Sequence, residues 1–167
     1  MALTYQAIAT VTVGSGGAAN IEFTSIPGTY TDLLVFVSGR SSTTNNYYRI
    51  NINNSALNFS GLYLNGSGSN GISGSSSPAF GRIPESGYTA NTFGNDFWYI
   101  PNYTSSNNKS ISVDAVAENN SATTNWLDFV AGLWSQSAAI TSIKFVPNAG
   151  NFAQHSTATL YGIKNTV

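Results

Sequence analysis

The residues best suited to acid–base or nucleophilic chemistry are few in this sequence. It contains no cysteine and one histidine, His155, which stands in the loop-like segment Asn151–Ser156. Serines are abundant, so a Ser–His pair is formally available. No G-x-S-x-G elbow stands between a strand and a helix, however, and that turn is what exposes a nucleophilic serine in hydrolases. We therefore predict no catalytic residue and a protein that is not an enzyme.

Seven carboxylates remain as candidates for glycoside cleavage or metal binding. Asp114 and Glu118 share one face of a predicted strand but lie two pleats apart, about 13 Å, which is too far for paired-carboxylate chemistry. Asp96 or Asp128 could approach one of them only through the fold. No D-x-D-x-D run suggests a calcium site, and the glycines at 14–17 join two strands without a helix N-terminus for a phosphate. We predict no metal and no cofactor. The seven are Glu22, Asp32, Glu85, Asp96, Asp114, Glu118 and Asp128.

Aromatic side chains are the stronger candidates for contacts. Several lie among turns rich in Asn and Ser, where exposed rings beside amide donors could stack on sugar rings or anchor a protein interface. Packing in a β-sandwich core is the competing interpretation, and the sequence favours it. The candidate glycan or subunit contacts are Tyr47, Tyr48, Tyr63, Tyr88, Trp98 and Tyr103.

The elements that must position these residues are strands. Tyr5 to Val13 has apolar odd positions separated by polar ones, with Ile8 as the exception, and Ala19 to Phe23 alternates in the same way. Glycines between the two segments favour a hairpin. Leu33 to Val37 is apolar on both faces and predicts a central strand. Further strands are expected at the ranges 48–52, 59–64, 97–103, 110–118, 126–134, 140–146 and 157–163.

Residues 65–79 are almost entirely Gly, Ser and Asn, with Ile72 alone in the middle. Such a composition cannot bury much surface, so we predict a surface loop that is either mobile or ordered against a neighbour. No stretch has helical periodicity. The whole chain, residues 1–167, is predicted to be one all-β domain, a jelly-roll-like antiparallel sandwich of about eight to ten strands. An immunoglobulin-like sandwich is the alternative.

The composition restricts the classes of partner. Charged residues make up only 8% of the chain and the formal net charge is −1. Ser, Thr and Asn supply about a third of the residues, far above ordinary usage. The six Lys and Arg are dispersed, which argues against nucleic acid, and no apolar run is long enough to cross a membrane. The N-terminus lacks the pattern of a signal peptide, so we expect synthesis and folding in a cytoplasm. A nearly uncharged surface gives little electrostatic protection against self-association, which favours a protein that works within an assembly over a solvated spacer.

With the strands placed, the sequence resembles small virion structural proteins of tailed bacteriophages, especially phages of aquatic bacteria. Residues 40–95 are the least similar part. The segments that carry the resemblance are Met1–Thr10, Phe23–Pro27, Tyr30–Leu33, Tyr99–Tyr103, Glu118–Asn120, Ala131–Trp134 and Ser156–Lys164.

The resemblance implies a structural role in the virion, with the protein made in the host bacterial cytoplasm. It implies either a capsid decoration (cement) protein on the head or a tail-fibre or receptor-binding protein that recognises host surface glycans. The chain has no shaft, repeat or coiled coil, which favours the first role. Implied partners are the major capsid protein or other virion proteins and further copies of the chain, with a trimer favoured. Residues 65–79 and the first strand are then candidate contacts, because strand addition locks subunits together.

Overall fold

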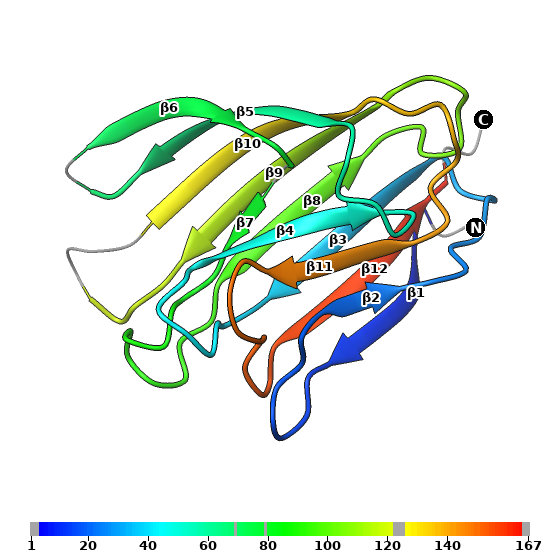
Figure 1. Ribbon diagram of the computed structural model, residues 1–167. Coiled ribbons are helices and arrows are strands. Elements are labelled where there is room, and N and C mark those ends of the chain that lie inside the picture. The colour runs from blue at the N-terminus through cyan, green and yellow to red at the C-terminus, as the bar shows by residue number, and fades with distance from the viewer. Residues whose placement is uncertain (1–3, 69, 79, 122–125, 165–167) are drawn as a thin grey trace.

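Two antiparallel β-sheets form the protein. The computed structural model describes residues 4–68, 70–78, 80–121 and 126–164. Within these ranges there are twelve strands and no helix, and so no helix that could cross a membrane (Figure 1). The prediction of an all-β sandwich is confirmed. The number of strands exceeds the expected eight to ten, because residues 71–76 and 80–82 form two short strands that were not predicted.

The larger sheet has eight strands in the order β1-β12-β3-β8-β9-β10-β5-β6, and the smaller has four in the order β2-β11-β4-β7. The eight are β1 (Tyr5–Thr12), β12 (Thr157–Ile163), β3 (Asp32–Ser38), β8 (Asn95–Ile100), β9 (Lys109–Ala117), β10 (Trp126–Trp134), β5 (Phe59–Gly66) and β6 (Gly71–Ser76). The four are β2 (Ile21–Phe23), β11 (Ile143–Pro147), β4 (Tyr47–Ile52) and β7 (Phe80–Arg82).

The chain passes back and forth between the sheets. The consecutive pairs β1–β2, β3–β4, β7–β8 and β11–β12 each place one strand in each sheet. The hairpins β5–β6 and β9–β10 are inserted between these pairs and lengthen the large sheet at one end. In Figure 1 the β5–β6 hairpin arches away from the small sheet.

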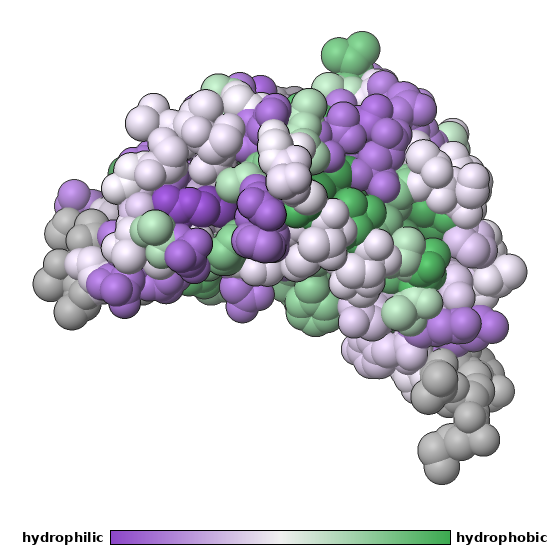
Figure 2. All heavy atoms as spheres, turned by 90° about the horizontal axis from the view of Figure 1, so that it is seen from below, coloured by the Kyte–Doolittle hydropathy of each residue, from purple (hydrophilic) through white to green (hydrophobic). Residues whose placement is uncertain are grey.

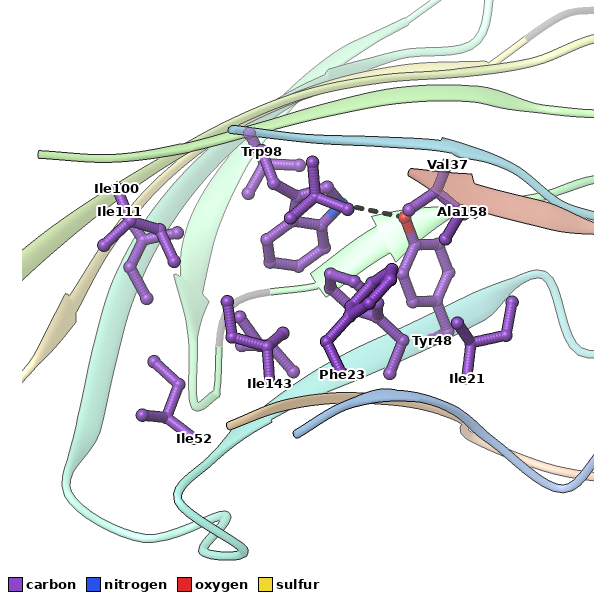
Figure 3. Close-up of a cluster of buried hydrophobic side chains, with 14 of the residues drawn as sticks. Ile21, Phe23, Val37, Tyr48, Ile52, Trp98, Ile100, Ile111, Ile143 and Ala158 are labelled. Atoms are coloured by element: carbon purple, nitrogen blue, oxygen red, sulfur yellow. Dashed lines mark hydrogen bonds between the residues drawn. The ribbon is translucent and has the colours of Figure 1, made fainter. Parts of the chain in front are cut away.

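The core lies between the two sheets and is built from the alternation expected of strands that are covered on one face. Trp98 of the large sheet and Tyr48 of the small sheet meet at its centre, where the Trp98 indole Nε1 donates a hydrogen bond of 2.8 Å to the Tyr48 hydroxyl (Figure 3). Phe145 packs against both rings, with centroid distances of 5.1 Å to Trp98 and 5.5 Å to Tyr48. All three side chains are fully buried.

The exception at Ile8 in the first strand has a structural cause. The pairing of β1 with β12 shifts by one residue between Ala7 and Ala9, so Ile8 is the extra residue of a β-bulge. A bulge reverses the inward-facing parity of the strand. Ile8 and Val11 consequently both pack against the core, although they differ in parity. As an edge strand, β1 is otherwise mostly exposed.

Two local predictions were wrong. The first two strands do not form a hairpin, because β1 pairs with β12 and β2 pairs with β11 in the other sheet. Residues 65–79 are not all loop, because β6 forms a six-residue edge strand paired with β5. A main-chain ladder needs no apolar side chains on the edge strand, so composition gives little sign of such a strand. Ser69 and Ala79 lie outside the described residues.

Candidate functional site

The six predicted contact aromatics divide into two groups. Tyr48, Trp98 and Tyr103 have no exposed surface, so the prediction that they contact a glycan or a neighbouring subunit was wrong. Their polar atoms are used inside the fold: the Tyr103 hydroxyl donates to the Pro27 carbonyl, and Tyr48 accepts from Trp98. The core-packing interpretation holds for these three.

Tyr47, Tyr63 and Tyr88 are partly exposed. Tyr88 lies in the segment 84–94, where Arg40 donates 2.9 Å hydrogen bonds to the carbonyls of Tyr88 and Thr89. Tyr47 and Tyr63 come together from different sheets, since both line one cleft with a volume of about 310 Å³. The structure therefore joins two of the six candidates at one site.

The outer face of the large sheet carries large apolar side chains that are exposed to solvent. Leu62, Leu64 and Phe129 are each more than half exposed, at 68%, 61% and 52%. They are direct neighbours, because Leu64 pairs with Phe129 across β5 and β10. We use the name apolar face for the seven large side chains that project outward here, namely Phe36, Leu62, Leu64, Phe97, Leu127, Phe129 and Leu133.

Part of the apolar face is hollowed into a groove of about 770 Å³, which crosses strands β8, β9, β10, β5 and β6. Figure 2, which views the molecule from below, shows the arched outline of the protein. One charged side chain, Asp114, lies within the groove beside Ser112. Toward the other end of the same sheet the rings of Phe36 and Phe97 meet edge-on at 5.4 Å.

The outer face of the small sheet is different in character. Glu22, Asn51 and Lys144 are neighbours in register, and Lys144 forms an ion pair of 3.2 Å with Glu22. Arg49 is exposed on the same face two residues before Asn51. We call these four residues the polar face. The two outer faces of the sandwich thus differ: the polar face of the small sheet is well solvated by water, and the apolar face of the large sheet is not.

A buried ion pair joins the inserted strands to the small sheet. Arg82 of β7 contacts Asp128 of β10, and their side chains are 1% and 0% exposed. The Arg82 guanidinium also lies over the rings of Tyr47 and Trp126, at 4.2 Å and 4.5 Å from their centroids. It donates a further 2.7 Å hydrogen bond to the Tyr47 hydroxyl. Asp128 holds the pKa of Arg82 above its usual value, although burial opposes this.

Asp96 is a second fully buried acid. Burial raises its pKa well above the ordinary value, and the charge of Asp128 adds to that rise, whereas the Tyr48 hydroxyl and the main-chain amides of Arg82 and Val116 oppose it. The sequence left open whether Asp96 and Asp128 approach other carboxylates, and the structure brings these two within electrostatic reach of each other. Both are enclosed in the core, so they have no access to a substrate.

Sequence reasoning missed these buried charges, although a signal existed. Asp128 has the same parity in its strand as Val130 and Trp134, and Lys109 has the same parity as Ile111. A charge at an inward position of an alternating strand predicts a buried, partnered group. Lys109 is 1% exposed and donates to the carbonyls of Asn107 and Gln136.

Among the described residues no group of three or more His, Asp or Glu side chains could hold a metal ion. Asp32 is used locally, where it accepts hydrogen bonds of 2.8 Å from the Tyr99 hydroxyl and 2.9 Å from the Asn102 amide. His155 is exposed, and its main-chain amide donates to the Val13 carbonyl. Comparison with protein-family models, curated proteins and solved structures gave no match to this chain.

Proposed function

We propose that this protein is a non-enzymatic structural component of a tailed bacteriophage virion, namely a capsid decoration protein that binds the head through its apolar face. The observation that carries the proposal is the apolar face itself. Its seven side chains are about half exposed on average, which leaves about 650 Å² of accessible surface for residues of roughly 200 Å² each. A stable protein interface buries about 800 Å² per partner, so this one face supplies most of an interface.

The partner on this face is a different protein in our proposal, not a second copy placed face to face. Asp114 is exposed in the groove. None of the described strand residues that project from the same sheet face is Lys or Arg. A face-to-face pair would bring two carboxylates into a desolvated interface without a cation, which is costly. A capsid surface that presents a Lys or Arg among apolar side chains would fit.

The strand order supports the proposal. We interpret β1-β12-β3-β8 facing β2-β11-β4-β7 as a jelly roll, with β5–β6 and β9–β10 as insertions. Jelly rolls are common in viral capsid proteins, but they also occur in lectins and cupins, so the fold alone does not select the function. The resemblance to virion proteins and the low charge of the chain favour the first group.

Copies of the chain would meet through the edges of the large sheet. Edge strands β1 and β6 contain neither a charged residue nor a proline, the residues that usually keep sheet edges apart. Pairing of an edge with that of a neighbour would build the homotrimer that the resemblance implies, without using the apolar face.

Locating the protein on intact virions tests the proposal. Labelled antibody should mark many sites on the head, and label confined to the tail would refute a head decoration role. Particles stripped of the protein should rebind the purified chain, and the double variant Leu62→Ser, Phe129→Ser should lose this binding. The matched control is Asn51→Ser on the polar face, which should bind normally. Equal binding by both variants would show that the apolar face is not the docking surface.

The second candidate is a tail-fibre or receptor-binding protein that recognises host surface glycans. The cleft that contains Tyr47 and Tyr63 is the observation that favours it. Label at the tail, together with binding to host polysaccharide, would support this role over the first.

A further inference from the structure

The 310 Å³ cleft lies where the two sheets meet on the polar side of the molecule. Register places the side chain of Phe80 beside Arg49, on the outer face of the small sheet. On the other side stand Tyr63 of β5 and the serines at 75–77, at the end of β6. The inserted β5–β6 hairpin thus supplies the residues of one wall and the small sheet those of the other. Figure 1 shows where these strands lie. The remaining lining residues are Tyr47, Pro78 and Asn148.

Three aromatic rings form a rigid base for this cleft. The Phe80 ring meets Tyr47 edge-on at 5.2 Å and Tyr63 at 5.4 Å. The Tyr63 ring lies across its partner residue Gly74, where a Cβ atom would be 2.6 Å from the Tyr63 hydroxyl. Tyr47 is held by the buried Arg82 through the 2.7 Å hydrogen bond to its hydroxyl. Rings fixed in advance lose little entropy when a ligand stacks on them.

The polar groups around the rings have a definite character. Asn148 is exposed and brings an amide to the cleft. The register of β6 with β5 places Ser76 on the same face as Tyr63, and its hydroxyl donates to the Pro78 carbonyl at 3.3 Å and can still accept a hydrogen bond. The Ser77 hydroxyl is already used on the Phe59 carbonyl. Of the described residues that line the cleft, Arg49 alone is charged. No described carboxylate lies within ion-pair distance of Arg49. An arginine without a counter-ion beside aromatic rings suits a ligand that has both an apolar ring face and an anionic group.

We propose that this cleft binds an acidic saccharide, a sugar ring that bears a carboxylate. The sugar ring packs on Tyr47 and Tyr63, its hydroxyls bond to Ser76 and Asn148, and its carboxylate pairs with Arg49. A volume of 310 Å³ is at the low end of the range for small-molecule sites, which suits a mono- or disaccharide unit of a longer chain.

The site does not depend on the role of the apolar face. The cleft opens beside Arg49 of the polar face, and Tyr63 projects from β5 on the side opposite to Leu62 and Leu64, so a protein docked by its apolar face would keep the cleft accessible to solvent. A decoration protein with such a site would hold a virion near acidic polysaccharide, and a tail protein would use it on the host surface. The binding experiment below is independent of where the protein is found on the virion.

The test uses the full chain with digalacturonic acid as the probe, followed by calorimetry and by amide chemical-shift mapping. We expect saturable binding with shifts at Arg49 and Tyr63, and binding of the neutral disaccharide lactose that is about tenfold weaker, as loss of one charged hydrogen-bond pair implies. Arg49→Gln should lower digalacturonate binding to the level of lactose and leave lactose unchanged. Lys144→Gln, which removes a cation from the same face outside the cleft, should change neither.

Three results would overturn the proposal. They are the absence of shifts at the cleft, equal binding of digalacturonate by Arg49→Gln and the unaltered chain, and binding of inorganic phosphate as tightly as digalacturonate, which would indicate a simple anion site. Tyr63→Phe guards against a folding artefact, because it keeps the ring and should retain most of the binding. Tyr63→Ala with an unchanged melting temperature should lose it, and retained binding there would refute stacking on Tyr63.

Discussion

The buried Arg82–Asp128 pair allows a quantitative prediction. In Asp128→Asn the side chain keeps its shape but loses its charge, which leaves the Arg82 guanidinium in the core without a counter-ion. Because both side chains are at most 1% exposed, solvent cannot screen the loss. Breaking one partner of such a pair costs about 3–5 kcal/mol. For a domain of this length each kcal/mol lowers the melting temperature by roughly 2–4 °C, so we expect a fall of about 10 °C.

The matched double variant separates a lost partner from lost packing. Arg82→Met with Asp128→Leu removes both charges, and replacement of a buried pair by apolar side chains is often neutral or stabilising. The double variant should therefore recover most of the stability that Asp128→Asn loses. Lys144→Gln, which breaks the partly exposed pair with Glu22, should cost less than about 1 kcal/mol.

Guanidinium chloride unfolding followed by tryptophan fluorescence measures all of these variants, since Trp126 stacks on Arg82 and reports on the site directly. Added salt should shift the curve of Lys144→Gln relative to the unaltered chain and leave the loss in Asp128→Asn unchanged. The reasoning is refuted if Asp128→Asn costs less than about 1 kcal/mol of unfolding free energy. It is also refuted if the double variant loses as much stability as Arg82→Met and Asp128→Leu lose in sum when each is made alone.

Three further predictions concern the core and the apolar face. The folded-state pKa of Asp96 is raised, so the folded protein binds the proton more tightly and stability falls as the pH rises from about 3.9, the unfolded value, through the folded pKa. In Asp96→Asn this decrease in stability with rising pH should disappear, and urea unfolding midpoints measured across pH test this. A variant with the same pH profile as the unaltered chain would contradict the prediction. Gly81→Ala should cost about 1–3 kcal/mol in thermal unfolding, because its Cβ would clash with Tyr48 and the Asp96 carboxyl, and an unchanged melting temperature would contradict this packing. Leu64→Ser should reduce binding of the apolar dye ANS by the folded protein, whereas Asn51→Ser should not; equal dye binding would mean that the apolar face is not accessible.

Much of the fold follows from alternation in the sequence. The strands at residues 126–134 and 157–163 were predicted with the bounds that the structure has, and β9 lies within one residue of prediction. Period-two patterns identify a strand from neighbouring residues alone, so no tertiary information is needed. The all-β class and the small number of titratable side chains are likewise properties of composition and pattern.

Other features depend on contacts between residues far apart in the chain. Alternation shows that Trp98 and Leu62 each lie on one face of a strand, but not which face the second sheet covers. The structure buries Trp98 under β4 and leaves Leu62 68% exposed. The cleft at Tyr47 and Tyr63 exists because the inserted hairpin curves past the edge of the small sheet. The aromatic residues that looked equivalent in sequence, and the apolar face that none of the predictions identified, were therefore distinguished only by which surfaces the two sheets cover.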